Sequence, residues 1–115
     1  MNKIIVGLLF LSISQTVFAK TVKCQVSEPV AGGAKMSVPV NVTSGNMIPS
    51  DDNINFKEKV FSVTWNAGGE YESQTYLQMQ FGESVSTMYD INLQKQVGPI
   101  NVIEFDGLRF QCWAE

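Results

Sequence analysis

Apolar and polar residues alternate over a long stretch of this chain, from Tyr71 to Leu93. Odd positions are mostly apolar and even positions mostly polar on both sides of Gly82. A period of two indicates β-strands, because successive side chains of a strand point to opposite faces of the sheet. We therefore expect a hairpin with one face in a core, and further strands that cover this face.

The apolar residues Phe81 and Val85 flank the predicted turn of this hairpin. Directly opposite residues of an antiparallel pair point to the same face, so pairing these two requires a loop with an odd number of residues. The sequence predicts a three-residue loop at 82–84, which places Leu77 opposite Tyr89.

Further strands are predicted before and after the hairpin, separated by turns rich in Gly, Pro, Asn and Asp. Residues 60–93 are predicted to form a three-stranded meander in which Trp65 pairs with Tyr71. The polar loop at 44–53 is expected to lead to another sheet. The remaining predicted strands are 21–28, 36–43, 101–105 and 108–113.

Local irregularities are expected at three places. In the strand 36–43, the side chains of Met36, Val38, Val40 and Val42 are predicted to point inward. Pro39 on its outward face lacks the N–H of a ladder donor, which marks an edge strand or a bulge. The apolar parity also switches near 57–59, which predicts a bulge or a corner between two short strands. At Asp106–Gly107 the pattern leaves open a hairpin turn or a bulge.

About seven short strands with regular turns indicate an all-β protein. We expect a small antiparallel β-sandwich, with a small closed or partly open β-barrel as the alternative. The two cysteines, Cys24 and Cys112, lie in the first and last predicted strands, and we expect a disulfide that joins these strands.

The first 19 residues have the pattern of a secretory signal peptide. Lys3 is followed by an apolar run from Ile4 to Leu11, and small residues precede the expected cleavage site between Ala19 and Lys20. This run is too short to span a membrane. We expect residues 20–115 to be a single β domain without a membrane span, located in the periplasm or secreted.

The composition argues against several chemistries. The chain has no histidine, which removes the usual general base and the Ser/His and Cys/His nucleophile pairs. Without Lys3 the chain carries seven basic and eleven acidic residues, a net charge of −4, and it contains no basic run. Nucleic acid is therefore not an expected partner. No phosphate-binding glycine loop is present, and no cofactor is expected.

Carboxylates are the remaining candidates for catalysis and for metal binding. Glu70, Glu72 and Asp90 are the acids that a carboxylate hydrolase would use. The segment 51–55 places Asp and Asn at alternate positions, as in calcium loops, but Phe56 stands where an EF-hand has glycine, so no metal is expected.

The polar side of the central hairpin is the candidate binding face. Amides, a carboxylate and an aromatic ring suit sugar hydroxyls or a protein partner. The predicted face consists of Gln74, Tyr76, Gln78, Gln80, Met88, Asp90 and Asn92.

These observations predict a small exported, non-catalytic binding protein. It would act as a binding module, an inhibitor or an accessory subunit with an unknown protein or glycan partner. The alternatives are a structural subunit that polymerises by adding strands edge to edge, and a carboxylate-based hydrolase. The sequence leaves the oligomeric state open.

Overall fold

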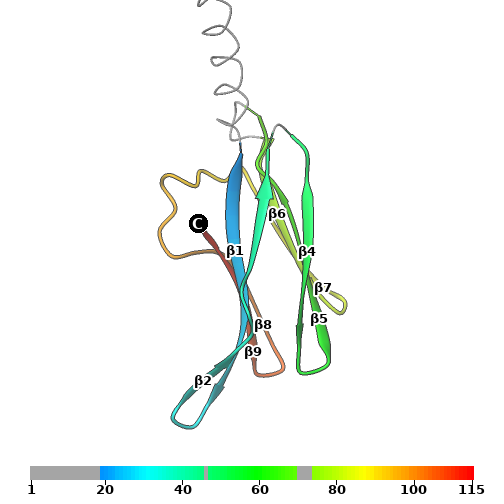
Figure 1. The fold of residues 1–115 in the computed structure, drawn as a ribbon, viewed down its shortest axis with the longest axis vertical. Helices are drawn as coiled ribbons and strands as arrows, with labels where there is room; N and C mark the ends of the chain where they lie inside the picture. Colours follow the sequence, from blue (N-terminus) through cyan, green and yellow to red (C-terminus); the bar gives the residue numbers. More distant parts are fainter. Residues whose placement is uncertain (1–18, 46, 70–73) are drawn as a thin grey trace, which may run out of the picture.

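The structure, a computed structural model, describes residues 19–45, 47–69 and 74–115. Within these ranges the chain forms nine β-strands and no α-helix (Figure 1). The strands are β1 (Lys20–Val30), β2 (Gly33–Met36), β3 (Val40–Ser44), β4 (Ser50–Phe56), β5 (Lys59–Asn66), β6 (Tyr76–Phe81), β7 (Ser84–Tyr89), β8 (Pro99–Phe105) and β9 (Leu108–Ala114).

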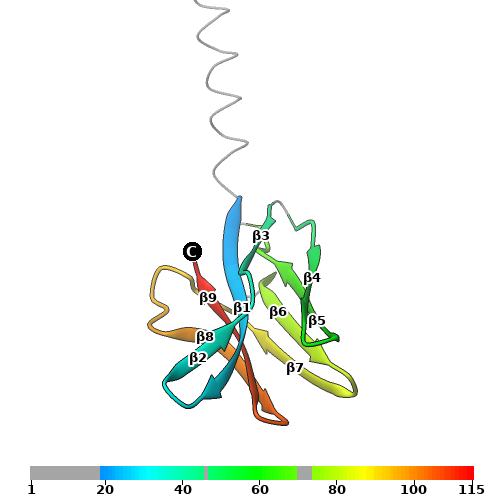
Figure 2. The same ribbon diagram turned by 60° about the horizontal axis from the view of Figure 1, so that its bottom comes forward.

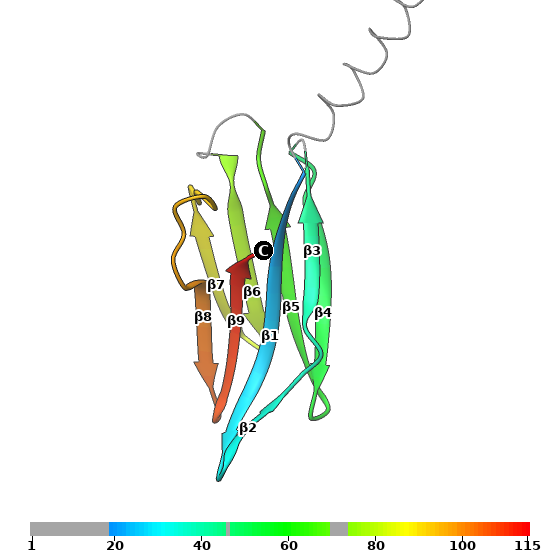
Figure 3. The ribbon, with the colours of Figure 1, turned by 60° about the vertical axis from the view of Figure 1, so that its left-hand side comes forward.

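The strands make two antiparallel sheets that pack face to face (Figures 2 and 3). In the first sheet, β1 pairs with β9 on one side and with β2 and then β3 on the other, and β8 follows β9. The second sheet has the order β4-β5-β6-β7. Both sheets are open, so the predicted sandwich is confirmed and the barrel alternative is wrong.

The core lies between the inner faces of the two sheets. Alternate residues are buried in the middle of β1 and along most of β5 and β9, which is the pattern of a sheet with one face covered. Trp65 is fully buried, and its Nε1 donates a hydrogen bond to the carbonyl of Lys20 across the core at 3.1 Å. The buried hydrophobic residues are Val22, Cys24, Val26, Val42, Ile54, Phe61, Val63, Trp65, Ala67, Leu77, Met79, Ile91, Ile100, Leu108, Phe110 and Cys112.

The predicted disulfide between Cys24 and Cys112 is confirmed. The two residues lie directly opposite each other on the adjacent strands β1 and β9, with a Cα–Cα distance of 4.1 Å. Both are fully buried, so the bond lies in the core and closes a loop with a sequence separation of 88. The first and last strands therefore sit side by side in one sheet.

Pro39 marks a β-bulge, one of the two predicted possibilities. Cys24 pairs with Val40, and Ser27 pairs with Met36. Two residues of β1, 25–26, therefore face three residues, 37–39, of the neighbouring segment. This irregularity divides the predicted strand 36–43 into β2 and β3. The predicted inward positions of Met36 and Val38 are wrong, because these side chains are 57% and 82% exposed at the interruption.

The parity switches of the sequence correspond to tight turns and one further bulge. Lys57 and Glu58 form a two-residue hairpin loop between β4 and β5, which replaces the predicted bulge or corner. Asp106 and Gly107 form the equivalent loop between β8 and β9, so this open question resolves as a hairpin. A bulge at the start of β8 leaves Ile100 without a partner in the register. This shift explains why the apolar residues change from even to odd positions between Ile100 and Ile103.

The predicted register of the central hairpin is wrong by one residue. Phe81 pairs with Ser84 instead of Val85, and the loop contains only Gly82 and Glu83. Gly82 has a φ of 59° whereas the φ of Glu83 is not positive, as expected for a type II′ turn with glycine first. Val85 therefore lies on the outer face and is 52% exposed, because an edge strand need not bury every apolar side chain.

Two boundaries next to the meander also differ from prediction. Trp65 pairs with Leu77, because β6 begins only at Tyr76. Tyr71, its predicted partner, lies outside the described residues. The polar loop is shorter than predicted, since β4 already begins at Ser50, but it does lead to the second sheet.

The predicted signal peptide lies outside the described residues except for Ala19. No helix within the described ranges is both long and apolar enough to cross a membrane.

Candidate functional site

The outer face of the second sheet is the candidate site. The register aligns its side chains in rows that cross the four strands. We call this surface the amide–tyrosine face. It consists of Asp51, Asn53, Asn55, Val60, Ser62, Thr64, Asn66, Tyr76, Gln78, Gln80, Val85, Thr87 and Tyr89.

Two tyrosines from neighbouring strands form the aromatic end of this face. Tyr76 on β6 lies opposite Tyr89 on β7, with ring centroids 6.3 Å apart and an interplanar angle of 47°. Tyr89 is 67% exposed and Tyr76 is half-buried. The exposed ring of Tyr89 and the half-buried ring of Tyr76 form a shallow apolar corner, and each phenol adds a polar group at its end.

Amides and hydroxyls occupy the rows beside the tyrosine pair. One row joins Asp51, Thr64, Gln78 and Thr87 in register. Gln78 Nε2 lies 3.4 Å from Thr87 Oγ1, a long contact that leaves most of the amide free to bond elsewhere. Such groups both donate and accept hydrogen bonds, and they do so without the desolvation cost of a buried charge.

The charge of the amide–tyrosine face is low. Asp51 is its one carboxylate, and none of its residues is lysine or arginine. A surface of this kind offers little attraction to a polyanion or a polycation. It is suited to a neutral, hydroxyl-rich or peptide-like partner.

The structure brings together three of the seven residues predicted for the binding face. Tyr76, Gln78 and Gln80 share the outer face of β6. Met88 lies opposite the core residue Leu77, so it points to the other side of the sheet.

The other three predicted residues lie in loops beyond the strands. Gln74 accepts a hydrogen bond from Gly69 N at 3.0 Å, and Asn92 Oδ1 accepts one from Gln94 N, also at 3.0 Å. Asp90 is exposed, with a φ of 57°, just after β7. These side chains belong to turns and not to the face.

Thr87 and Tyr89 were missed because the hairpin loop has two residues instead of three. The signal that identifies them is Gly82-Glu83, a Gly-X pair that suits a two-residue type II′ turn. The contribution of β4 and β5 could not be read from the sequence, because it depends on which strands become neighbours.

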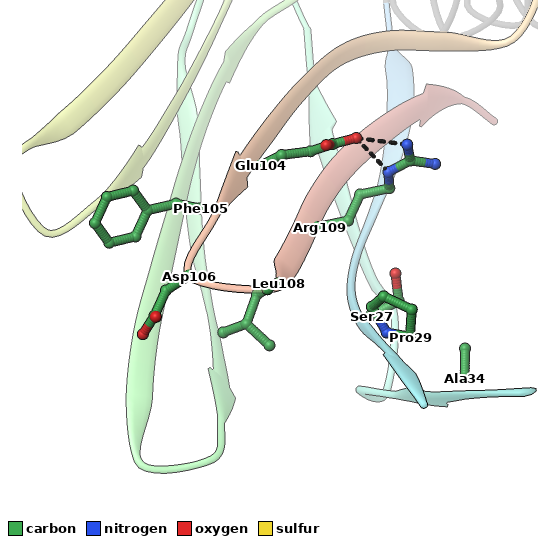
Figure 4. A pocket seen from close by; sticks show the side chains of 9 residues that line it. Ser27, Pro29, Ala34, Glu104, Phe105, Asp106, Leu108 and Arg109 are labelled. Atoms are coloured by element: carbon green, nitrogen blue, oxygen red, sulfur yellow. Dashed lines mark hydrogen bonds and ion pairs between the residues drawn. The ribbon is translucent and has the colours of Figure 1, made fainter. Parts of the chain in front are cut away.

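A hollow of about 610 Å³ lies elsewhere, between the β1–β2 hairpin and the β8–β9 turn (Figure 4). Glu104 and Arg109 form an ion pair across neighbouring strands beside it, with Arg109 Nε 2.8 Å from Glu104 Oε1. Asp106 also lines the hollow and pairs with Lys59 at 3.0 Å. Both acids therefore have cationic partners, and neither is arranged as a free catalytic carboxyl.

The outer face of the first sheet carries a second hollow, of about 540 Å³. Trp113 is half-buried there, and Lys23 and Met36 also line the surface. Glu70 and Glu72, the predicted acids of a hydrolase, lie outside the described residues. No group of three or more potential metal ligands occurs among the described residues.

Comparison with known protein families, with characterised proteins and with solved structures finds no match for this chain.

Proposed function

We propose that this protein is an exported, non-catalytic binding module that recognises a neutral polysaccharide through its amide–tyrosine face. The proposal is carried by one observation, the angled pair of Tyr76 and Tyr89 beside rows of amides and hydroxyls. An aromatic surface can cover the apolar C–H side of a sugar ring, while neighbouring amides bond its hydroxyls.

Export to the periplasm or the medium is part of this proposal. The N-terminal pattern and the buried disulfide support it, since a disulfide of this kind is compatible with an oxidising compartment. A flat face also suits an extended chain that lies across several strands better than a small molecule, which needs a concave site.

The test measures the binding of the oxidised protein, residues 20–115, to a panel of insoluble neutral polysaccharides by co-sedimentation and calorimetry. We expect Tyr76→Ala and Gln78→Ala each to weaken binding about tenfold, which corresponds to the loss of one ring or amide contact. Protein isolated from its native source is expected to begin at Lys20.

Gln111→Ala is the matched control for Gln78→Ala. Gln111 is also half-buried, and it lies on the outer face of the first sheet. The Gln111→Ala substitution should leave polysaccharide binding unchanged. The proposal fails if no polysaccharide of the panel is retained, or if the Gln111 variant loses as much affinity as the Gln78 variant.

A further inference from the structure

The edge strands of the described sheets differ in how they are protected against pairing with another chain. Edge strands are normally blunted by charges, prolines or bulges. β4 carries Asp51 and Asp52, β8 carries Pro99 and Glu104, and the β2–β3 edge is interrupted at Pro39. β7 has no charged residue, no proline and no bulge.

The backbone of β7 has hydrogen-bonding groups that point away from β6. Residues that flank a two-residue hairpin loop form a hydrogen-bonded pair, so Ser84 and every second residue after it bond to β6. The bond from Asp90 N to Thr75 O, at 3.1 Å, continues this alternation. The N–H and C=O groups of Val85, Thr87 and Tyr89 therefore point toward the free edge.

β8 does not close this edge. β7 and β8 share no ladder pairing, and the polar contact between them is a side-chain hydrogen bond from Asn101 Nδ2 to Ser86 Oγ at 2.9 Å. Three large apolar side chains of the six-residue strand remain exposed: Val85 at 52%, Met88 at 42% and Tyr89 at 67%.

The sequence of β7 is complementary to itself. In an antiparallel pair centred on Thr87, Thr87 of each copy lies opposite Thr87 of the other, and Val85 lies opposite Tyr89. Thr–Thr pairs and pairs of β-branched with aromatic residues are favourable cross-strand pairs. Asp90 comes opposite Ser84, so no like charges meet.

We propose that this protein forms a symmetric homodimer in which β7 of one copy pairs antiparallel with β7 of a second copy. Each outward N–H and C=O of Val85, Thr87 and Tyr89 gains a backbone partner in this arrangement. The two-fold axis passes between the Thr87 residues of the two copies, and the contact uses the same edge of both, so the assembly closes as a dimer and does not grow into a fibre.

The dimer has a consequence for the surface but does not depend on the proposed polysaccharide binding. A two-fold axis perpendicular to the joined sheet places both amide–tyrosine faces on the same side. A polymeric partner would then meet two sites at once, which raises its apparent affinity.

The primary experiment uses Thr87→Cys in the oxidised protein, residues 20–115. Directly opposite residues of a hydrogen-bonded antiparallel pair have Cα atoms about 5.5 Å apart, which is within the range of a disulfide. We expect a covalent dimer linked through position 87, identified by peptide mapping without reduction. Thr64→Cys is the matched control, because Thr64 lies in the same row of the same face but on an inner strand. This control should not cross-link.

A second experiment introduces charged residues at position 87 and measures the mass of the assembly by light scattering. It does not depend on the formation of a disulfide. Thr87→Lys and Thr87→Glu should each weaken the dimer about tenfold or more, because like charges then lie opposite each other at the axis. An equimolar mixture of the two variants should form a heterodimer.

The proposal is overturned if the unmodified protein is monomeric across the micromolar to millimolar range. It is also overturned if Thr64→Lys dissociates the dimer as strongly as Thr87→Lys does, since this would indicate face-to-face association. These measurements contain no polysaccharide, so their failure is distinct from a failure of the proposed function.

Discussion

At the scale of single residues, buried hydroxyl groups are found where the strand ladder is interrupted. Ser37, Ser44 and Thr75 are the buried polar residues of the described chain. Ser37 lies in the bulge, where its Oγ accepts a hydrogen bond from Val26 N at 3.0 Å. Ser44 ends β3, and its Oγ accepts a bond from Ala67 N at 2.9 Å. Each hydroxyl thus supplies a bond that a regular ladder would have supplied.

Thr75 provides the clearest test of this principle. It is 2% exposed, and its Oγ1 both donates to the carbonyl of Ile91 and accepts from the N–H of Ile91. Thr75→Val keeps the shape but leaves both backbone groups without this partner. We expect the free energy of unfolding in urea to fall by about 2–3 kcal/mol.

Thr75→Ser is the matched control, since it keeps the hydroxyl and removes only a methyl group. It should cost about 1 kcal/mol. Equal losses for the two variants would show that packing, and not hydrogen bonding, makes Thr75 important.

At the scale of elements, two-residue loops close four hairpins among the described strands, and their backbone conformations differ. In the β4–β5 loop both Lys57 and Glu58 have positive φ, at 53° and 64°, as a type I′ turn requires. In the β6–β7 loop only Gly82 has positive φ, and Glu83 does not. The first of these loops places two side chains in a left-handed conformation that glycine adopts at lower cost.

This difference predicts opposite effects for the same substitution at two exposed turn positions. Glu58→Gly should stabilise the protein by about 0.5–1 kcal/mol, because it relieves a left-handed residue that is not glycine. Glu83→Gly should destabilise it by about 0.5–1 kcal/mol, because it only adds freedom to the unfolded chain.

Both substitutions remove one negative charge, so the change in net charge is matched. Thermal unfolding followed by circular dichroism is the measurement. A shift of the same sign for both variants would contradict the assignment of the two turns.

At the scale of the whole molecule, the disulfide joins two neighbouring strands inside the first sheet. β1 and β9 are inner strands, so the link stabilises the sheet on which β2, β3 and β8 depend. In the chain-entropy description, a bond that closes a loop of this length contributes about 4–5 kcal/mol. This is a large share of the stability of a small domain.

We therefore expect the double variant Cys24→Ala/Cys112→Ala to lose about 4–5 kcal/mol of unfolding free energy in urea. The reduced protein keeps both cysteine side chains but lacks the S–S bond. Its unfolding free energy therefore separates the loss of the link from the loss of packing around the sulfur atoms. If the reduced protein unfolds at the same urea concentration as the oxidised protein, the disulfide does not stabilise the fold.

The sequence was sufficient to predict the all-β class, the disulfide and most strands, because alternation and turn residues act over a few neighbouring positions. It also identified Tyr76, Gln78 and Gln80 as one face, since they follow one another at a period of two on β6. The register of β7 follows from the two-residue turn at Gly82-Glu83, and apolar alternation indicated the wrong register because an edge strand is not required to bury Val85 or Tyr89. The tertiary structure set which strands became neighbours, which placed Asp51, Thr64 and Gln78 in one row and left β7 at the edge of the described second sheet. Pairing between distant strands depends on the packing of the whole core, and no short stretch of sequence contains that information.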